Sequence, residues 1–277
     1  MNQLGEQYLR KEALPLLWCP GCGIGTILNA TVRAIDSLGI RDRLALVGGI
    51  GCSGWLPVYI DADTLHVLHG RAIPFATGLK MSDPSRKVIA FSGDGDCLGI
   101  GGNHFIHGAR RNIDITVIMV HNQIYGMTGG QVAPTTPIAS KTKTSPYGNF
   151  ERPFDACEVA RASGATYVAR WTTAQPRQIS KAIAEAIEHK GFSFVEVLTQ
   201  CPTQAGRVVY GTADPAKLLD MIKASTISVN AAKDKSPEEL SGKIMVGTLH
   251  HDQQCPDFSS LYYDKILKAA STTKQGR

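Results

Sequence analysis

Four short apolar runs in the chain are each followed by glycine, cysteine or a polar side chain. The runs are residues 44–48, 88–91, 115–120 and 194–198. Stretches with helical spacing of apolar residues separate them, and this alternation predicts βαβ units on a parallel sheet. The carboxyl ends of parallel strands meet at one edge of such a sheet, where ligands bind. The motifs that follow the runs should therefore converge on one rim, and they contain Cys52, Asp94, Asn122 and Cys201.

The rest of the pattern defines the fold class. The predicted helices are residues 25–38, 101–111, 154–163 and 176–189. Residues 134–150 form a polar Pro/Thr/Ser loop, and the alternation stops near residue 215. We expect an α/β fold in residues 1–212, with a mostly parallel sheet flanked by helices. Residues 213–277 are expected to be an irregular C-terminal tail that packs on a partner subunit.

Composition excludes several classes of protein. The 277 residues, 43% hydrophobic, suffice for one large α/β domain and a tail. No run of 18 apolar residues predicts a membrane span, and the charged N-terminus lacks the apolar core of a signal peptide, so we expect a cytoplasmic protein. The net charge of +5, without a dense basic stripe, argues against nucleic acid as a partner. Seven cysteines, an odd number, argue against a disulfide framework and for metal ligands among them.

The turn Gly93-Asp94-Gly95-Asp96 has the properties of a phosphate site. Two glycines around an aspartate let backbone N–H groups approach a phosphate, and the next helix offers its positive N-terminus. Asp94 and Asn122, which follows one helix and one strand later, carry hard oxygen ligands that suit Mg²⁺. Alone, the Gly-Asp-Gly turn is more often an ordinary turn. Its combination with Asn122 favours a diphosphate and magnesium site.

This spacing resembles the thiamine diphosphate motif. His121 stands where that motif often has the first of two asparagines, but Asn122 keeps the position of the metal ligand. The resemblance implies that the backbone carbonyl of Ile124 also binds Mg²⁺. In the next loop it implies that Met127 props the bent cofactor and that Thr128 helps to hold the diphosphate. Met127 is equally compatible with an ordinary core position.

Four cysteines are candidate ligands of one metal centre. Cys19 and Cys22 form a Cys-x-x-Cys pair in a Pro-Gly turn, a pattern also found in redox dithiols and zinc sites. Cys52 and Cys201 lie on the predicted rim. Four thiolates suit either Zn²⁺ or a [4Fe–4S] cluster, and a position beside thiamine diphosphate favours the redox cluster. The cysteines not expected to bind the metal are Cys97, the strongest competitor, Cys157 and Cys255.

The chain resembles the β subunits of 2-oxoacid:ferredoxin oxidoreductases. The similarity extends from about residue 8 to about residue 203 and includes WCPGCG, GIGCSGW, LHGRAIPFATGLK, SGDGDCLGIGGNHFIHGARRNIDI and HNQIYGMTGGQVAPTTP. It implies that Cys19, Cys22, Cys52 and Cys201 bind a [4Fe–4S] cluster. It also implies coenzyme A-dependent oxidative decarboxylation of a 2-oxoacid, or the reverse carboxylation, with electrons passing through the cluster to ferredoxin.

The resemblance also bears on the substrate. WCPGCG is more similar to the 2-oxoglutarate-type subunits, so we expect 2-oxoglutarate and succinyl-CoA, with pyruvate or branched-chain 2-oxoacids as alternatives. His69 and Arg71 belong to a loop at the implied cofactor pocket, where they suit the substrate carboxylate or the diphosphate. Arg71 is also compatible with a surface or interface salt bridge. Ser53, next to Cys52, is expected at the cofactor.

A complete thiamine enzyme needs a second domain with a glutamate that activates the cofactor, and this chain has no second α/β domain. The resemblance therefore implies an α subunit that carries this glutamate, with γ and δ subunits as further candidates and ferredoxin as the acceptor. Two other functions stay open. One is a non-redox thiamine diphosphate lyase subunit with a structural zinc site, and the other is a zinc-stapled scaffold without activity.

Overall fold

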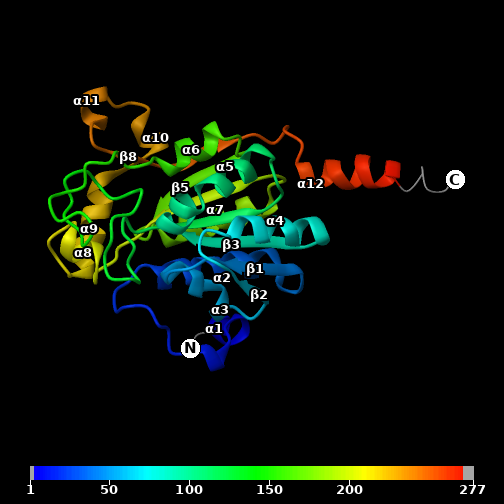
Figure 1. The fold of residues 1–277 in the computed structure, drawn as a ribbon, viewed down its shortest axis with the longest axis horizontal. Helices are drawn as coiled ribbons and strands as arrows, with labels where there is room; N and C mark the ends of the chain where they lie inside the picture. The colour runs from blue at the N-terminus through cyan, green and yellow to red at the C-terminus, as the bar shows by residue number, and fades with distance from the viewer. Residues whose placement is uncertain (1–2, 271–277) are drawn as a thin grey trace.

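The computed structural model describes residues 3–270, which form one eight-stranded sheet between layers of helices (Figure 1). The strand order is β2-β1-β3-β4-β6-β5-β8-β7. Neighbouring strands run parallel except for β5 and β8. The strands are β1 (Leu44–Gly48), β2 (Asp63–His66), β3 (Lys87–Gly93), β4 (Thr116–His121), β5 (Tyr167–Thr172), β6 (Ser193–Leu198), β7 (Thr226–Ser228) and β8 (Ile244–His251). The predicted α/β class with a mostly parallel sheet is confirmed.

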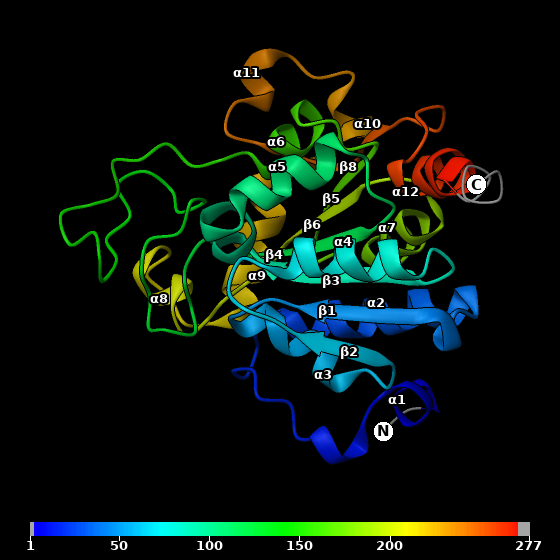
Figure 2. The same cartoon turned by 45° about the vertical axis from the view of Figure 1, so that its right-hand side comes forward.

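Helices cover both faces of the sheet (Figure 2). The longer ones are α2 (Ile24–Leu38), α4 (Ala72–Ser82), α5 (Gly102–Arg110), α6 (Ala156–Ala162), α7 (Pro176–Glu188) and α9 (Pro215–Ser225). The shorter ones are α1 (Gln3–Tyr8), α3 (Leu56–Tyr59), α8 (Ala205–Val208), α10 (Val229–Ala232), α11 (Pro237–Leu240) and α12 (Phe258–Leu261). Helices α2 and α7 share one apolar core, and α4, α5 and α6 share the other.

Strand β1 shows why the central strands are continuously apolar. Leu44 and Leu46 point into the core under α2 and α7, whereas Ala45 and Val47 point into the core under α4 and α5. Successive side chains of a strand face opposite sides, so a strand covered on both faces must be apolar at every position. All five residues of β1 are buried accordingly.

The segment after residue 215 differs from the expected irregular tail. After α9 it contributes β7 and β8, and β8 pairs antiparallel with β5 and so belongs to the main sheet. The sequence pattern misses β8 because Gly247 and the polar residues around it interrupt the apolar run, and only Val246 and Gly247 of this strand are buried. Residues 271–277 of the segment lie outside the described residues.

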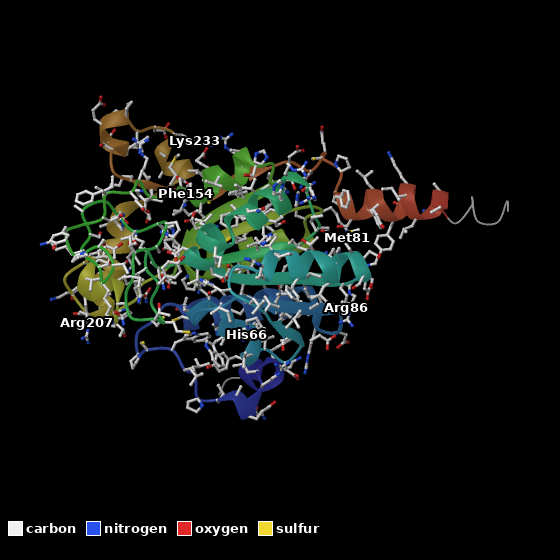
Figure 3. All side chains as sticks on the ribbon, viewed as in Figure 1. His66, Met81, Arg86, Phe154, Arg207 and Lys233 are labelled. Atoms are coloured by element: carbon white, nitrogen blue, oxygen red, sulfur yellow. The ribbon has the colours of Figure 1, made fainter. Side chains whose placement is uncertain are left out.

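The loops that follow the parallel strands gather at one end of the molecule. Figure 3 shows Arg207, which follows β6, at this end, and Met81 and Arg86, which precede β3, at the opposite end. The rim predicted for ligands is therefore the end that carries α8 and the long loop between β4 and α6. None of the helices in residues 3–270 is long and apolar enough to cross a membrane.

Candidate functional site

A cavity of about 120 Å³ opens at the C-terminal ends of β1, β3 and β4. Its walls come from the segments after these strands and from the loop before α4. The predicted residues that line it are Cys52, Ser53, His69, Gly93, Asp94, Gly95, Asp96, Asn122, Ile124, Met127 and Thr128. Sequence segments that lie far apart in the chain thus meet on one rim, as expected from a parallel sheet.

Asp94 forms the floor of the cavity at the end of β3. It is 2% exposed, and its carboxylate accepts hydrogen bonds from the backbone N–H of Gly95 at 2.9 Å and of Gln123 at 2.7 Å. The Thr135 hydroxyl donates a third hydrogen bond at 2.5 Å. A Cβ on Gly95 would collide with the ring of Tyr125, so this turn needs glycine. The carboxylate is therefore fixed in orientation by both neighbouring loops.

The donor set around Asp94 fits a divalent cation. Burial raises the pKa of the Asp94 carboxyl, although His121 and the hydrogen bonds from Thr135 and Gln123 oppose this shift. A buried carboxylate is charged at low cost only beside a cation. Asn122 and Ile124 line the same cavity as Asp94, and amide and carbonyl oxygens are ligands that Mg²⁺ accepts.

Asp96 organises the opposite wall. Its carboxylate accepts hydrogen bonds from His69 Nδ1 at 2.5 Å, from the N–H of Gly70 at 2.7 Å and from the N–H of Ile50 at 3.2 Å, as well as from the Ser92 hydroxyl. Asp96 is only 2% exposed. Its role in this structure is to hold the loops before α4 and after β1 against the cavity, and the His69 ring is thereby placed on the cavity wall.

Arg71, in contrast, does not line the cavity. Its Nη1 lies 3.5 Å from the carbonyl oxygen of His69, and 3.4 Å from those of Gly70 and Ile100. The guanidinium thus binds backbone carbonyls of the loop before α4 and of η4 (Gly95–Ile100). His69 therefore lines the cavity in this structure, and Arg71 does not.

The loop after β4 covers the cavity. The N–H of Tyr125 donates to the Gln131 carbonyl at 3.1 Å, and the N–H of Gly130 donates to the Tyr125 carbonyl at 3.0 Å. These bonds close a tight loop with Met127 and Thr128 at its tip. Met127 is 50% exposed and lines the cavity, so it is not an ordinary core residue.

The Cys-x-x-Cys turn docks on the segment after β6. The N–H of Cys22 donates to the Cys19 carbonyl at 3.0 Å, which closes the turn. The N–H of Gly23 donates to the Gln200 carbonyl at 3.2 Å, and Gln200 Nε2 donates to the Gly21 carbonyl at 3.2 Å. Cys201 follows Gln200 directly, so these bonds bring Cys19 and Cys22 close to Cys201.

The four predicted cysteines form one electrostatic group. Burial raises the pKa of the Cys22 thiol to about 12, and Cys201, Cys52 and Cys19 each add to this shift. Burial together with Cys201 and Cys19 raises the pKa of Cys52 to about 11. Thiols with such pKa values stay protonated at neutral pH unless a cation binds them. Within residues 3–270, no group of three or more His, Cys, Asp or Glu side chains has the geometry to hold a metal ion.

The other three cysteines lie apart from this group. Cys97 is 1% exposed in η4, and Cys157 is 1% exposed in α6, where its thiol donates to Glu196 at 3.0 Å. Cys255 is exposed in the segment before α12, near Asn112. That they are not ligands stays a prediction.

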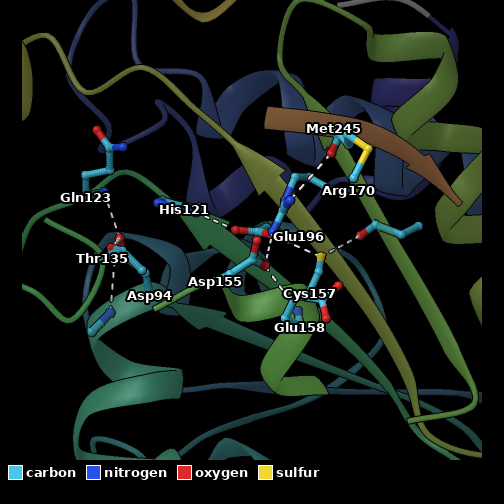
Figure 4. A network of polar contacts seen from close by, with 12 residues as sticks. Asp94, His121, Gln123, Thr135, Asp155, Cys157, Glu158, Arg170, Glu196 and Met245 are labelled. Atoms are coloured by element: carbon cyan, nitrogen blue, oxygen red, sulfur yellow. Dashed lines mark hydrogen bonds and ion pairs between the residues drawn. The ribbon is translucent and has the colours of Figure 1, made fainter. Parts of the chain in front are cut away.

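Sequence reasoning missed a buried ionic network below the rim (Figure 4). Glu196 of β6 is 0% exposed, and it accepts hydrogen bonds from Arg170 Nε at 2.6 Å and His121 Nδ1 at 2.5 Å. Arg170 also pairs with Asp155. The network supports His121, which directly precedes Asn122. Its only signal in the sequence is a charged residue inside an otherwise apolar strand. Sequence reasoning also missed Tyr125, which lines the cavity, and Thr135, which donates a hydrogen bond to Asp94.

Replacing Glu196 by glutamine should lower the free energy of unfolding by about 3 kcal/mol or more at pH 7, because Arg170 and His121 lose their buried counter-charge. Burial alone would raise the pKa of Glu196, but Arg170 and His121 outweigh it and lower that pKa to about 2. The ionised form therefore stabilises the fold above the ordinary pKa of 4.5, and this stability is lost as the pH falls from there toward 2.

Urea unfolding of both chains between pH 7 and pH 4 measures this difference, which should shrink below pH 4.5. The control is Glu158→Gln on α6, where an exposed glutamate pairs with exposed Arg161 and a change within about 0.5 kcal/mol is expected. Equal stability of the Glu196→Gln and Glu158→Gln chains would contradict the role of the network.

The fold and the cavity define a thiamine diphosphate-binding domain, and comparison with known families agrees. The family model for the thiamine pyrophosphate enzyme C-terminal TPP binding domain matches residues 49–197. This range contains β3 and β4, two of the three strands that end at the cavity, and all of the residues that line it.

Similar proteins show which family of thiamine diphosphate-binding proteins the chain belongs to. The 2-oxoglutarate synthase subunit KorB of Methanocaldococcus jannaschii is 50% identical over 267 residues, which is 96% of this chain and 98% of that protein. The KorB subunit of Archaeoglobus fulgidus is 55% identical over 216 residues, 78% of this chain and 79% of that protein. The chain belongs to the family of 2-oxoacid:ferredoxin oxidoreductase β subunits.

A solved structure supports the same assignment. The 2-oxoglutarate:ferredoxin oxidoreductase from Magnetococcus marinus, with 2-oxoglutarate, coenzyme A and succinyl-CoA bound, superposes with a TM-score of 0.86 at 33% identity. The match covers 97% of this chain and 91% of that chain. The likeness therefore includes the segment after residue 215 as well as the cavity.

Proposed function

We propose that this chain is the catalytic β subunit that converts 2-oxoglutarate and coenzyme A to succinyl-CoA and carbon dioxide, or the reverse, with two electrons passed singly to ferredoxin. One observation carries the proposal. The position of a Cβ on Gly126 would be 3.7 Å from the Asn122 amide nitrogen and 3.7 Å from the Cys201 sulfur. One glycine thus lies between Asn122 of the cofactor cavity and Cys201 of the cysteine group, an arrangement that suits electron transfer between two redox sites.

In this proposal Asp94, Asn122 and the Ile124 carbonyl bind Mg²⁺ and, through it, the diphosphate. Gly93, Gly95 and Asp96 form the turn at the diphosphate, with Thr128 and Ser53 beside it. Thiamine diphosphate, when bound, supplies a nucleophilic carbon and an electron sink for decarboxylation. Met127 supports the cofactor from the covering loop, and the His69 ring, held by Asp96, faces the substrate side of the cavity.

Cys19, Cys22, Cys52 and Cys201 bind a [4Fe–4S] cluster in the same proposal. Their shared electrostatics and their place beside Gly126 support it. A [4Fe–4S] cluster, when bound, supplies a one-electron carrier. Trp18 stabilises this end of the site, because its indole N–H donates to the Cys52 carbonyl at 2.7 Å.

The catalytic unit needs a partner. Of the residues that line the cavity in the described part of the chain, the carboxylates are Asp94 and Asp96, and both are already bound by their own loops. The glutamate that activates the cofactor therefore comes from an α subunit in our proposal. Ferredoxin is the acceptor, and γ or δ subunits and a cytoplasmic location stay predictions.

The substrate assignment is tested on the complex purified without oxygen. We expect kcat/KM for 2-oxoglutarate to exceed those for pyruvate and 2-oxoisovalerate by at least about 100-fold, because a site that pairs a distal carboxylate is left with an unpaired charge by the other acids. Reduction of a viologen dye with coenzyme A present measures the rates. Equal or faster turnover of pyruvate would contradict 2-oxoglutarate as the substrate and leave the family assignment intact.

A further inference from the structure

2-Oxoglutarate carries a second carboxylate, remote from the carbon that reacts, and a selective site needs a cation for it. Arg71 does not meet this need from its position in the structure, since its guanidinium already binds three backbone carbonyls. A different cation has to reach the open side of the cavity, which the loop with Met127 and Thr128 borders.

Lys143 lies on this side. Its Nζ is 2.5 Å from the point where a Cβ on Gly129 would stand, and Gly129 directly follows Thr128 of the cavity wall. Gly129 has φ +106°, a backbone conformation that L side chains rarely adopt. The missing side chain at residue 129 leaves the space that the ammonium group occupies. The loop between β4 and α6 thereby brings a cation next to the covering loop that borders the cavity.

The backbone around Lys143 is held against the covering loop. The N–H of Lys143 donates to the Gly130 carbonyl at 3.0 Å, and the N–H of Val132 donates to the Thr144 hydroxyl at 3.0 Å. A turn from Thr142 to Ser145 closes behind them, with N–H to carbonyl bonds of 3.2 and 3.3 Å. The base of the side chain is therefore fixed, and less entropy is lost when the ammonium binds an anion.

The ammonium group is available for a ligand. No ion pair within residues 3–270 includes Lys143. The two cavity carboxylates bind other donors. Asp94 accepts hydrogen bonds from the Gln123 N–H and the Thr135 hydroxyl. Asp96 accepts hydrogen bonds from the His69 ring and the Gly70 N–H. A cation beside the covering loop, without a carboxylate partner among the described residues, is suited to an anionic group of the substrate.

We propose that Lys143 is a specificity-determining residue that binds the distal carboxylate of 2-oxoglutarate. This inference rests on the proposed function, because it presupposes a dicarboxylate substrate in this cavity. In the proposed function the Asp94 turn holds the diphosphate end of the cofactor. Lys143 lies beside Gly129 of the covering loop and not at that turn, so its role is to discriminate between substrates rather than to hold the cofactor.

The test compares 2-oxoglutarate with 2-oxopentanoate, which has the same number of carbons and no distal carboxylate. In the assembled complex Lys143→Met should lower kcat/KM for 2-oxoglutarate by about 10-fold to 100-fold, through KM, and leave 2-oxopentanoate unchanged. Lys143→Arg should restore most of the preference. Lys141→Met, an exposed lysine of the same loop, is the matched control and should behave as the unchanged complex.

Binding of thiamine diphosphate to the same variants, followed by intrinsic tryptophan fluorescence, should give equal Kd values for Lys143→Met and Lys141→Met. Equal losses with both acids, a weaker Kd for thiamine diphosphate, or a rise only in the KM for coenzyme A would overturn the inference. Failure of the proposed function looks different: the unchanged complex would then not prefer 2-oxoglutarate over 2-oxopentanoate at all.

Discussion

The Cys201→Ala chain should lose its iron and acid-labile sulfide and the visible absorbance of a cluster. Cys201 lies beside the covering loop, 3.7 Å from the Cβ position of Gly126, and its charge acts on both Cys22 and Cys52. Removing one of four thiolates leaves an iron without its protein ligand, which a [4Fe–4S] cluster in a solvent-accessible site does not survive. Iron and sulfide assays on protein purified without oxygen measure the loss, which should be nearly complete.

The matched control is Cys255→Ala. Cys255 is exposed and lies near Asn112, outside the cysteine group at the rim. That variant should keep the full iron content. Cys157→Ala is a poorer control for stability, because the Cys157 thiol donates to buried Glu196. Full iron in Cys201→Ala, or zinc in place of iron in the unchanged chain, would show that the cysteines do not hold this cluster.

Asp94→Asn should weaken Mg²⁺-dependent binding of thiamine diphosphate by at least about 100-fold, since even residues that only support a metal ligand typically contribute 10-fold to 100-fold. The substitution keeps the shape of the side chain and removes the charge that faces the cation. Asp94 also accepts hydrogen bonds from Gln123 N–H and Thr135, so part of the effect comes from the loops that these bonds hold.

Titration of apo-protein with thiamine diphosphate at fixed Mg²⁺ measures this affinity. Asn122→Ala is a second variant for the same site. The control is Asp83→Asn, a half-buried aspartate just beyond α4 that pairs with Arg86, away from the cavity. Both site variants should keep their iron, because the cluster and the cation use different side chains. A Kd equal to that of the unchanged chain in both site variants would refute the magnesium site.

The rim was predictable because its residues stand out from the strands they follow. Packing does not explain why polar residues and cysteines follow buried strands: an aspartate between glycines after β3, an asparagine after β4, and cysteines after β1 and β6. The topology of a parallel sheet places these residues together at one edge. The resemblance then added roles for Ile124 and Met127 that the residue types alone do not define.

The parts that were missed depend on contacts that only the folded chain makes. In the sequence, Glu196 is a single charged residue in an apolar strand. Its role becomes visible only when the fold places Arg170 and His121 beside it. Strand β8 carries a glycine and polar residues, and it is a strand because β5 leaves an edge for it to pair with. Lys143 belongs to a polar loop without periodicity, and its place over Gly129 follows from how that loop folds back.

Electron paramagnetic resonance of the complex, frozen after mixing with 2-oxoglutarate without oxygen, tests most directly whether the cofactor cavity and the cysteine group work as one redox site. We predict the signal of a reduced [4Fe–4S] cluster in the unchanged complex, and the loss of that signal in the complex that carries Cys201→Ala. The same signal in both complexes, or no reduced cluster in the unchanged one while it still decarboxylates 2-oxoglutarate, would contradict the account.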